Sequence, residues 1–209
     1  MLHKNVLPDQ LWELLIRMMK FEPLRDFFLV GGTALALRLG HRESVDLDLF
    51  TLETFDAEKL ANSLAQELPT ERVYHEPDTI RAVISGVKVD LLLHAYPLIS
   101  QVELIDGIRV ASLPDLAAMK LNAVSGRGLR KDFWDIAAML RSYGLKDMLG
   151  FYREKYRSGD VWHLIRALDY FEDAEQDTTL VRSIWPYEWG EVKRIIKEAM
   201  ETFVTERHI

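Results

Sequence analysis

The chain has 209 residues, of which 48% are hydrophobic and 28% charged, and it contains no cysteine. That length suffices for one sizeable core or two small ones, and the lack of cysteine excludes disulfides, thiolate zinc sites and cysteine nucleophiles. The formal net charge of −7 argues against binding nucleic acid over the whole surface.

The N-terminal segment carries an amphipathic helical pattern that begins after Pro8 and Asp9. It lacks both the long apolar stretch and the small-residue cleavage site of a signal peptide. No apolar run elsewhere approaches the length of a membrane-spanning helix. We therefore expect a cytoplasmic protein with no membrane partner.

A short strand and a glycine pair come next in the chain. Phe27 to Val30 has the length and apolar density of a buried strand, and Gly31-Gly32 allows a sharp turn that brings backbone N–H groups close to an anion. Thr33 adds a hydroxyl group, and Ala34 to Leu39 are good helix formers whose first turn would direct free N–H groups at a phosphate. A Gly-Gly pair alone is usually only a turn, but this segment can bind phosphate.

Two aspartates follow on a second predicted strand. Val45 to Phe50 alternates so that Asp46 and Asp48 share one face and the aliphatic residues the other. Two carboxylates on one strand face offer hard oxygen ligands, which suit Mg²⁺ or Mn²⁺. The ordinary alternative is the solvated face of an edge strand. The phosphate-binding turn lies one helix away, and the two features together favour metal-dependent nucleotidyl transfer.

A third carboxylate is expected if two metal ions are to be held. Asp90 is the candidate, because it lies in the predicted strand Val87 to Leu93 and shares its face with Lys88. An acid in so apolar a strand is costly unless it is solvated or paired with a cation. A simple salt bridge to Lys88 is therefore an open alternative.

The remaining pattern changes from mixed to helical along the chain. Before Leu113 we predict a helix at 56–68, strands at 72–74, 79–84 and 108–111, and turns at 75–78 and 85–86. After it we predict helices at 114–125, 131–143, 147–157, 160–172 and 190–206. This indicates an α/β (α+β) fold with two lobes, 1–112 and 113–209.

Charged residues within the predicted helical lobe suggest a function. Lys120 is the one cation in the apolar stretch Leu116 to Ala123, so it either extends to water or reaches a buried anion, and we favour a triphosphate. In the next helix Lys131 and Asp135 are i, i+4 neighbours, and Asp132 and Asp135 are i, i+3 neighbours. We hypothesise that Asp132 or Asp135 organises Lys120 or activates a hydroxyl nucleophile. The alternative is an ordinary surface ion pair, which contributes little to stability.

The segment from Lys120 to Arg157 carries nine basic residues against four acidic ones, a local excess of five positive charges. Such a lobe could hold an RNA end, although ordinary helix-surface charge explains it equally well. The acidic stretch Asp169 to Asp177 is most simply a solvated helix end and loop.

Three segments resemble the motifs of one family. GGTALALRLGHRESVDLDLF, VKVDLL and MKLNAVSGRGLRKDFWDIAAML resemble the first, second and third motifs of the AbiEii/AbiGii-type nucleotidyltransferase toxins, and the resemblance covers nearly the whole chain. It implies the nucleotidyltransferase superfold, with Gly31 and Gly32 lining a triphosphate. It also implies that Asp46, Asp48 and Asp90 hold metal. The positions that match the third motif are Lys120, Arg127, Lys131, Asp132 and Asp135.

We therefore expect transfer of a nucleoside monophosphate from an NTP to an acceptor hydroxyl, with release of pyrophosphate. The resemblance implies tRNA or another RNA as acceptor, inhibition of growth, and a cognate antitoxin as partner. The candidate catalytic residues are Asp46, Asp48, Asp90, Lys120 and Asp135. The candidate nucleotide-binding residues are Gly31, Gly32, Thr33, Lys120, Arg127 and Lys131. Transfer to a small-molecule hydroxyl such as an aminoglycoside, and a catalytically silent nucleotide-binding module, stay open as alternatives.

Overall fold

A computed structural model of the protein describes residues 1–207. Its contacts divide the chain into two units. Unit 1 comprises Met1–Pro97 and Gln101–Ser112, and unit 2 comprises Leu98–Ser100 and the chain from Leu113 on. The lobes expected from sequence are 1–112 and 113–209, whereas the structure assigns Leu98–Ser100 to unit 2. Residues 208 and 209 of the second lobe lie outside the described residues.

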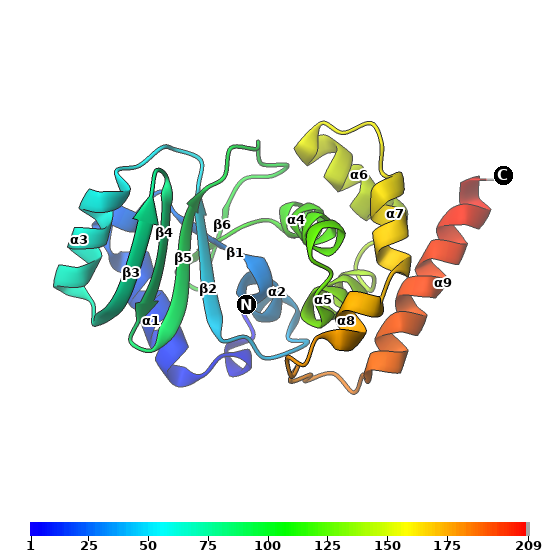
Figure 1. Cartoon of the computed structure of the whole chain (residues 1–209), viewed down its shortest axis with the longest axis horizontal. Helices are drawn as coiled ribbons and strands as arrows, with labels where there is room; N and C mark the ends of the chain where they lie inside the picture. The colour runs from blue at the N-terminus through cyan, green and yellow to red at the C-terminus, as the bar shows by residue number, and fades with distance from the viewer. Residues whose placement is uncertain (208–209) are drawn as a thin grey trace. The chain divides into compact units, whose positions relative to one another are not determined.

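Unit 1 is built on a mixed sheet whose strands run in the order β3-β4-β5-β2-β1-β7-β6; Figure 1 shows β3, β4, β5 and β2 side by side. The strands are β1 (Phe28–Val30), β2 (Asp46–Thr51), β3 (Thr70–Glu76), β4 (Thr79–Ile84), β5 (Val87–Leu93), β6 (Glu103–Ile105) and β7 (Ile108–Val110). The helices are α1 (Asp9–Lys20), α2 (Gly31–Leu39) and α3 (Ala57–Glu67), with 3₁₀ turns η1 (Lys4–Val6) and η2 (Glu22–Leu24). The predicted fold class, a mixed sheet with helices followed by a helical region, is confirmed.

The element boundaries differ from expectation at a few points. The strand expected at 72–74 extends over the whole of β3, because it pairs with β4 as far as Glu76, and the turn is only Pro77-Asp78. Val45 precedes β2 and is exposed. The strand β6 is an addition, which pairs antiparallel with β7 through the tight turn Asp106-Gly107.

Alternation along the central strands gives the sheet an apolar and a polar face. Leu47 and Leu49 are buried, whereas Asp46 and Asp48 are half-buried. The apolar face continues through Val89, Leu91, Ile80, Ala82 and Ile84, and α3 packs against β3 and β4. We call the other side the open face of β2 to β5. Its residues, matched by strand register, are Asp46, Asp48 and Phe50 of β2, Lys88, Asp90 and Leu92 of β5, Thr79, Arg81 and Val83 of β4, and Arg72, Tyr74 and Glu76 of β3.

Unit 2 is helical. Its helices are α4 (Leu113–Gly126), α5 (Arg130–Met139), α6 (Leu145–Tyr156), α7 (Trp162–Asp169), α8 (Glu172–Gln176) and α9 (Trp189–Arg207), coloured green to red in Figure 1. α4 packs against α5, α6 and α7. Part of the expected acidic loop forms α8, because Ala174 is buried and its carbonyl accepts a hydrogen bond from the Arg130 guanidinium at 3.0 Å. No helix within residues 1–207 is both long and apolar enough to cross a membrane.

A buried ion pair fixes the first turn of α4. Lys155 Nζ of α6 lies 2.7 Å from Asp115 Oδ1, and both side chains are fully buried. The same carboxylate accepts hydrogen bonds from the backbone N–H groups of Ile99 and Ser100, at 3.0 and 3.1 Å. These bonds hold the 98–100 segment against α4 and explain why it belongs to unit 2.

Candidate active site

The turn between β1 and α2 brings the backbone against a carboxylate. Gly31 has a φ of +69°, in the left-handed region that favours glycine. A Cβ atom at this position would lie 2.2 Å from Asp48 Oδ2 on the neighbouring strand. The missing side chain therefore allows the Asp48 carboxylate to lie directly beside the start of α2.

Gly32 makes room for a cation that sequence reasoning missed. A Cβ atom on Gly32 would lie 2.3 Å from Nη2 of Arg42, whose side chain is buried. Arg42 Nη1 also donates to the carbonyl of Glu43 at 2.9 Å. The second glycine thus admits a guanidinium group. The available signal was the arginine in the short HRES segment between the helix and the acidic strand.

Thr33 anchors the acidic strand. Its side chain is fully buried, and its hydroxyl lies 2.8 Å from Ser44 Oγ and donates to the Asp46 carbonyl at 2.5 Å. These contacts link the first turn of α2 to the first residue of β2. In this structure Thr33 therefore positions Asp46; a contact of its hydroxyl with phosphate stays a prediction.

The three predicted acids lie on adjacent strands of the open face. β2 and β5 are parallel, and their register sets Asp48 beside Asp90 and Asp46 beside Lys88. The salt bridge left open for Asp90 is present, because Lys88 Nζ lies 3.0 Å from Asp90 Oδ2. The other oxygen, Asp90 Oδ1, is buried and has no hydrogen-bond partner. A buried carboxylate oxygen without a partner is costly, so it is available for a cation or a donor supplied by a ligand.

These residues fit a magnesium ion in the chemistry of their donors. The face offers carboxylate oxygens, one of them unsatisfied, and oxygen is the donor that Mg²⁺ prefers. Across residues 1–207, however, no three Asp, Glu or His side chains converge closely enough to hold a metal ion between them. The acids are neighbours on the sheet without forming a closed cage, which suits an ion that keeps several ligands from water and substrate.

Unit 2 holds the second group of predicted residues as a buried ionic cluster. Lys120 Nζ of α4 lies 2.9 Å from Asp132 Oδ1 and 2.8 Å from Asp135 Oδ2, both on α5. Arg127 adds a bond from Nε to Asp132 Oδ2 at 3.0 Å. Both carboxylates are fully buried and Lys120 is 5% exposed. The alternative of a surface ion pair is therefore wrong for the two acids. Lys131 is half-buried on the first turn of α5.

The cluster sets the ionisation of Asp132. Burial by itself would raise the pKa of this carboxyl, but the charges of Lys120 and Arg127 and their hydrogen bonds together lower the pKa below its usual 3.8. Two cations and two carboxylates balance, so the cluster can remain charged inside the helical unit. A contact of Lys120, Arg127 or Lys131 with a triphosphate stays a prediction.

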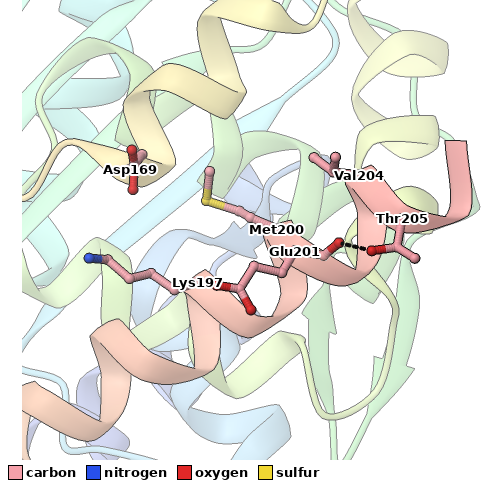
Figure 2. Close-up of a pocket in the computed structure, with 6 residues that line it drawn as sticks. All are labelled: Asp169, Lys197, Met200, Glu201, Val204 and Thr205. Atoms are coloured by element: carbon pink, nitrogen blue, oxygen red, sulfur yellow. Dashed lines mark hydrogen bonds between the residues drawn. The ribbon is translucent and has the colours of Figure 1, made fainter. Parts of the chain in front are cut away.

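A further hollow in unit 2 lies beside α9 and contains none of the predicted site residues. Its volume is about 550 Å³, and Figure 2 shows its lining residues, Asp169, Lys197, Met200, Glu201, Val204 and Thr205. The Thr205 hydroxyl donates to the Glu201 carbonyl at 2.9 Å, as the dashed line in Figure 2 marks. Two acids, Asp169 and Glu201, and one base, Lys197, line this hollow, so its charge favours no single class of ligand.

Three solved structures share this fold. JHP933 from Helicobacter pylori is 18% identical, covers 97% of each chain and has a TM-score of 0.55. MenT4, a nucleotidyltransferase toxin from Mycobacterium tuberculosis H37Rv, is 13% identical over 91% of this chain and 81% of its own, with a TM-score of 0.54. ANT(2″)-Ia in complex with adenylyl-2″-tobramycin is 18% identical over 68% and 94%, with a TM-score of 0.52. The fold is that of the nucleotidyltransferases.

Sequence similarity narrows this class to a family. The model of the nucleotidyl transferase AbiEii toxin of type IV toxin–antitoxin systems matches residues 13–85 and 87–194. The protein aq_aa25 of Aquifex aeolicus strain VF5 is 34% identical over 185 residues, which are 86% of this chain and 88% of that protein. The chain belongs to the AbiEii nucleotidyl transferase toxin family, and the resemblance stated from its motifs is confirmed.

The contact between Gly31 and Asp48 leads to a testable prediction. A Gly31→Ala variant places a methyl group where Asp48 Oδ2 now lies and forces a left-handed alanine, which costs roughly 1–2 kcal/mol. We expect that loss in the free energy of urea unfolding, together with a loss of nucleotide transfer because the carboxylate is displaced. Gly150→Ala is the matched control, since no atom lies within 4 Å of the added Cβ and α6 continues through it. If both variants unfold alike, the close approach does not constrain the turn.

Proposed function

We propose that this protein transfers a nucleoside monophosphate from an NTP to the hydroxyl group of an RNA, and that it acts as the toxin of a toxin–antitoxin pair. The observation that carries the proposal is the glycine turn at Gly31 lying directly against Asp48, with Asp90 beside it in register. The turn proposed to bind phosphate thus lies at the start of α2, beside the strands that carry the proposed cation ligands. Membership of the AbiEii family supports the same reaction class.

In the proposed reaction the acceptor oxygen attacks the α-phosphorus of the NTP. A new P–O bond forms, the bond from the α-phosphorus to the bridging oxygen breaks, pyrophosphate leaves, and the hydroxyl proton passes to solvent or a base. Backbone N–H groups at Gly31 and Gly32 would bind phosphate oxygens. Asp46, Asp48 and Asp90 would hold Mg²⁺ or Mn²⁺, which supplies positive charge to the triphosphate and lowers the pKa of the attacking hydroxyl.

The roles given to the second cluster rest on the family motif and, for Lys120, also on its place in an apolar helix. In that assignment Lys120, Arg127 and Lys131 offset negative charge on the triphosphate, and Asp135 orients Lys120 or accepts a proton. The 2.8 Å contact between Asp135 and Lys120 supports the orienting role. A cognate antitoxin as partner follows from the family. We propose tRNA or another RNA as the acceptor.

The test is incubation of the purified protein with Mg²⁺, each of the four α-³²P-labelled NTPs in turn, and total bacterial RNA. We expect label in RNA with one preferred NTP, and none when EDTA replaces Mg²⁺. A parallel reaction replaces RNA with tobramycin. Label in the aminoglycoside alone would assign a small-molecule acceptor, and no label in either acceptor would contradict the proposed reaction.

A further inference from the structure

The open face continues from the acids to the edge of the sheet. Strand register sets Arg81 of β4 opposite Asp90 of β5, and Tyr74 of β3 opposite Arg81. Arg72 lies two residues before Tyr74 on the same face, opposite Val83. Strands lie about 4.8 Å apart, so Tyr74 is roughly 10 Å across the sheet from Asp90. The two arginines and the tyrosine therefore lie on the same face as the carboxylates, between them and the edge of the sheet.

Both arginines lack the partners that surface arginines usually find. Arg72 and Arg81 are exposed, and their side chains make no hydrogen bond and no ion pair with any group in residues 1–206. Asp90 is adjacent to Arg81 in register, yet it pairs with Lys88 instead. In a chain of net charge −7, these two guanidinium groups are cations of the open face that no carboxylate in the described part of the chain neutralises by direct contact. Guanidinium groups bind phosphates with paired N–H donors.

Tyr74 supplies an aromatic surface between these cations. Its side chain is 55% exposed, and its hydroxyl donates to Glu76 Oε2 at 3.2 Å, which restrains the outer end of the ring. An exposed aromatic ring between phosphate-binding cations is the arrangement on which bases of single-stranded nucleic acid stack. β3 is also an edge strand, so a strand of nucleic acid can leave the sheet there without crossing other elements of the sheet.

We propose that Arg72, Tyr74 and Arg81 form a docking face for the hydroxyl-bearing end of a single-stranded RNA acceptor. This inference rests on the proposed function, because it takes Asp46, Asp48 and Asp90 as the place of transfer. The arginines bind backbone phosphates and Tyr74 stacks with a base.

The experiment measures binding of a short 5′-fluorescein-labelled single-stranded RNA to the full chain by fluorescence anisotropy over a salt series. In an Arg72→Gln/Arg81→Gln variant we expect Kd to rise about tenfold or more and the slope of log K against log salt to fall by about 1 to 2, as for two lost phosphate contacts. Tyr74→Ala should weaken binding roughly tenfold, whereas Tyr74→Phe keeps the ring and should not.

The matched control is Lys20→Gln/Lys59→Gln, which removes the same charge from the exposed surfaces of α1 and α3. Its Kd should equal that of the wild type. Equal weakening in the two double variants would mean that only net charge matters and would overturn the docking face. A Kd for RNA in the Arg72→Gln/Arg81→Gln variant equal to that of the wild type would also overturn the docking face. If the Arg72→Gln/Arg81→Gln variant loses binding to polyglutamate but binds RNA as the wild type does, the face would be assigned to an acidic protein instead.

Transfer of label from NTP is measured on the same samples, which separates the two proposals. RNA labelling at the wild-type level by the Arg72→Gln/Arg81→Gln variant leaves nucleotidyl transfer standing and overturns the docking face. Weakened RNA binding in that variant, with no transfer by the wild type to RNA or tobramycin, supports RNA binding at this face and overturns the proposed reaction.

Discussion

An Asp48→Asn variant is expected to transfer nucleotide about 10³-fold more slowly than the wild type, the loss typical of removing one electrostatic group that acts in the transition state. Asparagine has the size of aspartate and fits beside Gly31, but it lacks the negative charge that a hard cation requires. The fold should therefore persist. The measurements are the initial rate of label transfer at saturating NTP and Mg²⁺, and the free energy of urea unfolding.

Asp26→Asn is the matched control for this substitution. The Asp26 carboxylate lies on the exposed surface of unit 1, 3.4 Å from Arg25 Nε, so losing its charge should change neither rate nor stability noticeably. A wild-type rate in Asp48→Asn would remove this carboxylate from the chemistry. A slow rate accompanied by unfolding would mean that Asp48 holds the turn and would leave its role in catalysis unsupported.

Much of unit 1 can be predicted from sequence because residues alternate along its central strands. The pattern of β2, with leucines between aspartates, allows only one face to be buried, and the structure buries that face. The same pattern gives β4 and β5 their predicted bounds. β6 is missing from the prediction although ELIDGIRV carries a signal for it: Asp-Gly between apolar residues favours a two-residue hairpin turn, and Asp106 and Gly107 both have positive φ.

The candidate site could be predicted less completely because its packing joins residues distant in sequence. The turn and the three acids were predicted from local spacing, but local spacing cannot show that Arg42 packs against Gly32. Nor could it distinguish a surface pair from a buried cluster at Asp132 and Asp135. That difference depends on α4 packing against α5, which brings Lys120 to both carboxylates.

Removing Lys120 from that cluster is expected to destabilise the protein strongly. Lys120→Met leaves Asp132 and Asp135 buried without the ammonium group that lies within 2.9 Å of each, and breaking a buried pair in this way costs about 3–5 kcal/mol. Urea unfolding at pH 7 measures the loss. Adding Asp135→Asn to Lys120→Met should recover part of it, because the charge of Asp135 that Lys120 had offset is then gone and Asp132 keeps its bond to Arg127.

The same ionic pattern occurs on the surface and provides the control. Arg194 of α9 pairs with Glu191 at 2.6 Å and with Glu198, so one cation again joins two carboxylates, but all three side chains are substantially exposed. Water and salt screen such pairs, so Arg194→Met should change stability little. Equal losses in Lys120→Met and Arg194→Met would show that burial of the Lys120 cluster contributes nothing.

The pH dependence of the loss tests whether charge is its cause. Because the pKa of Asp132 is lowered in the folded state, its ionised form contributes stability that is present above its ordinary pKa of 3.8 and is lost as the pH falls through the folded pKa. In Lys120→Met the part of that contribution that comes from Lys120 is gone, so the stability difference from the wild type should be largest near pH 7 and shrink below about pH 4. A constant difference would mean that Lys120 acts through packing of its aliphatic chain. The transfer rate of Lys120→Met is measured under conditions where this variant stays folded. A rate equal to that of the wild type would remove Lys120 from triphosphate binding. A slower rate would support a role of Lys120 in triphosphate binding in addition to its role in stability.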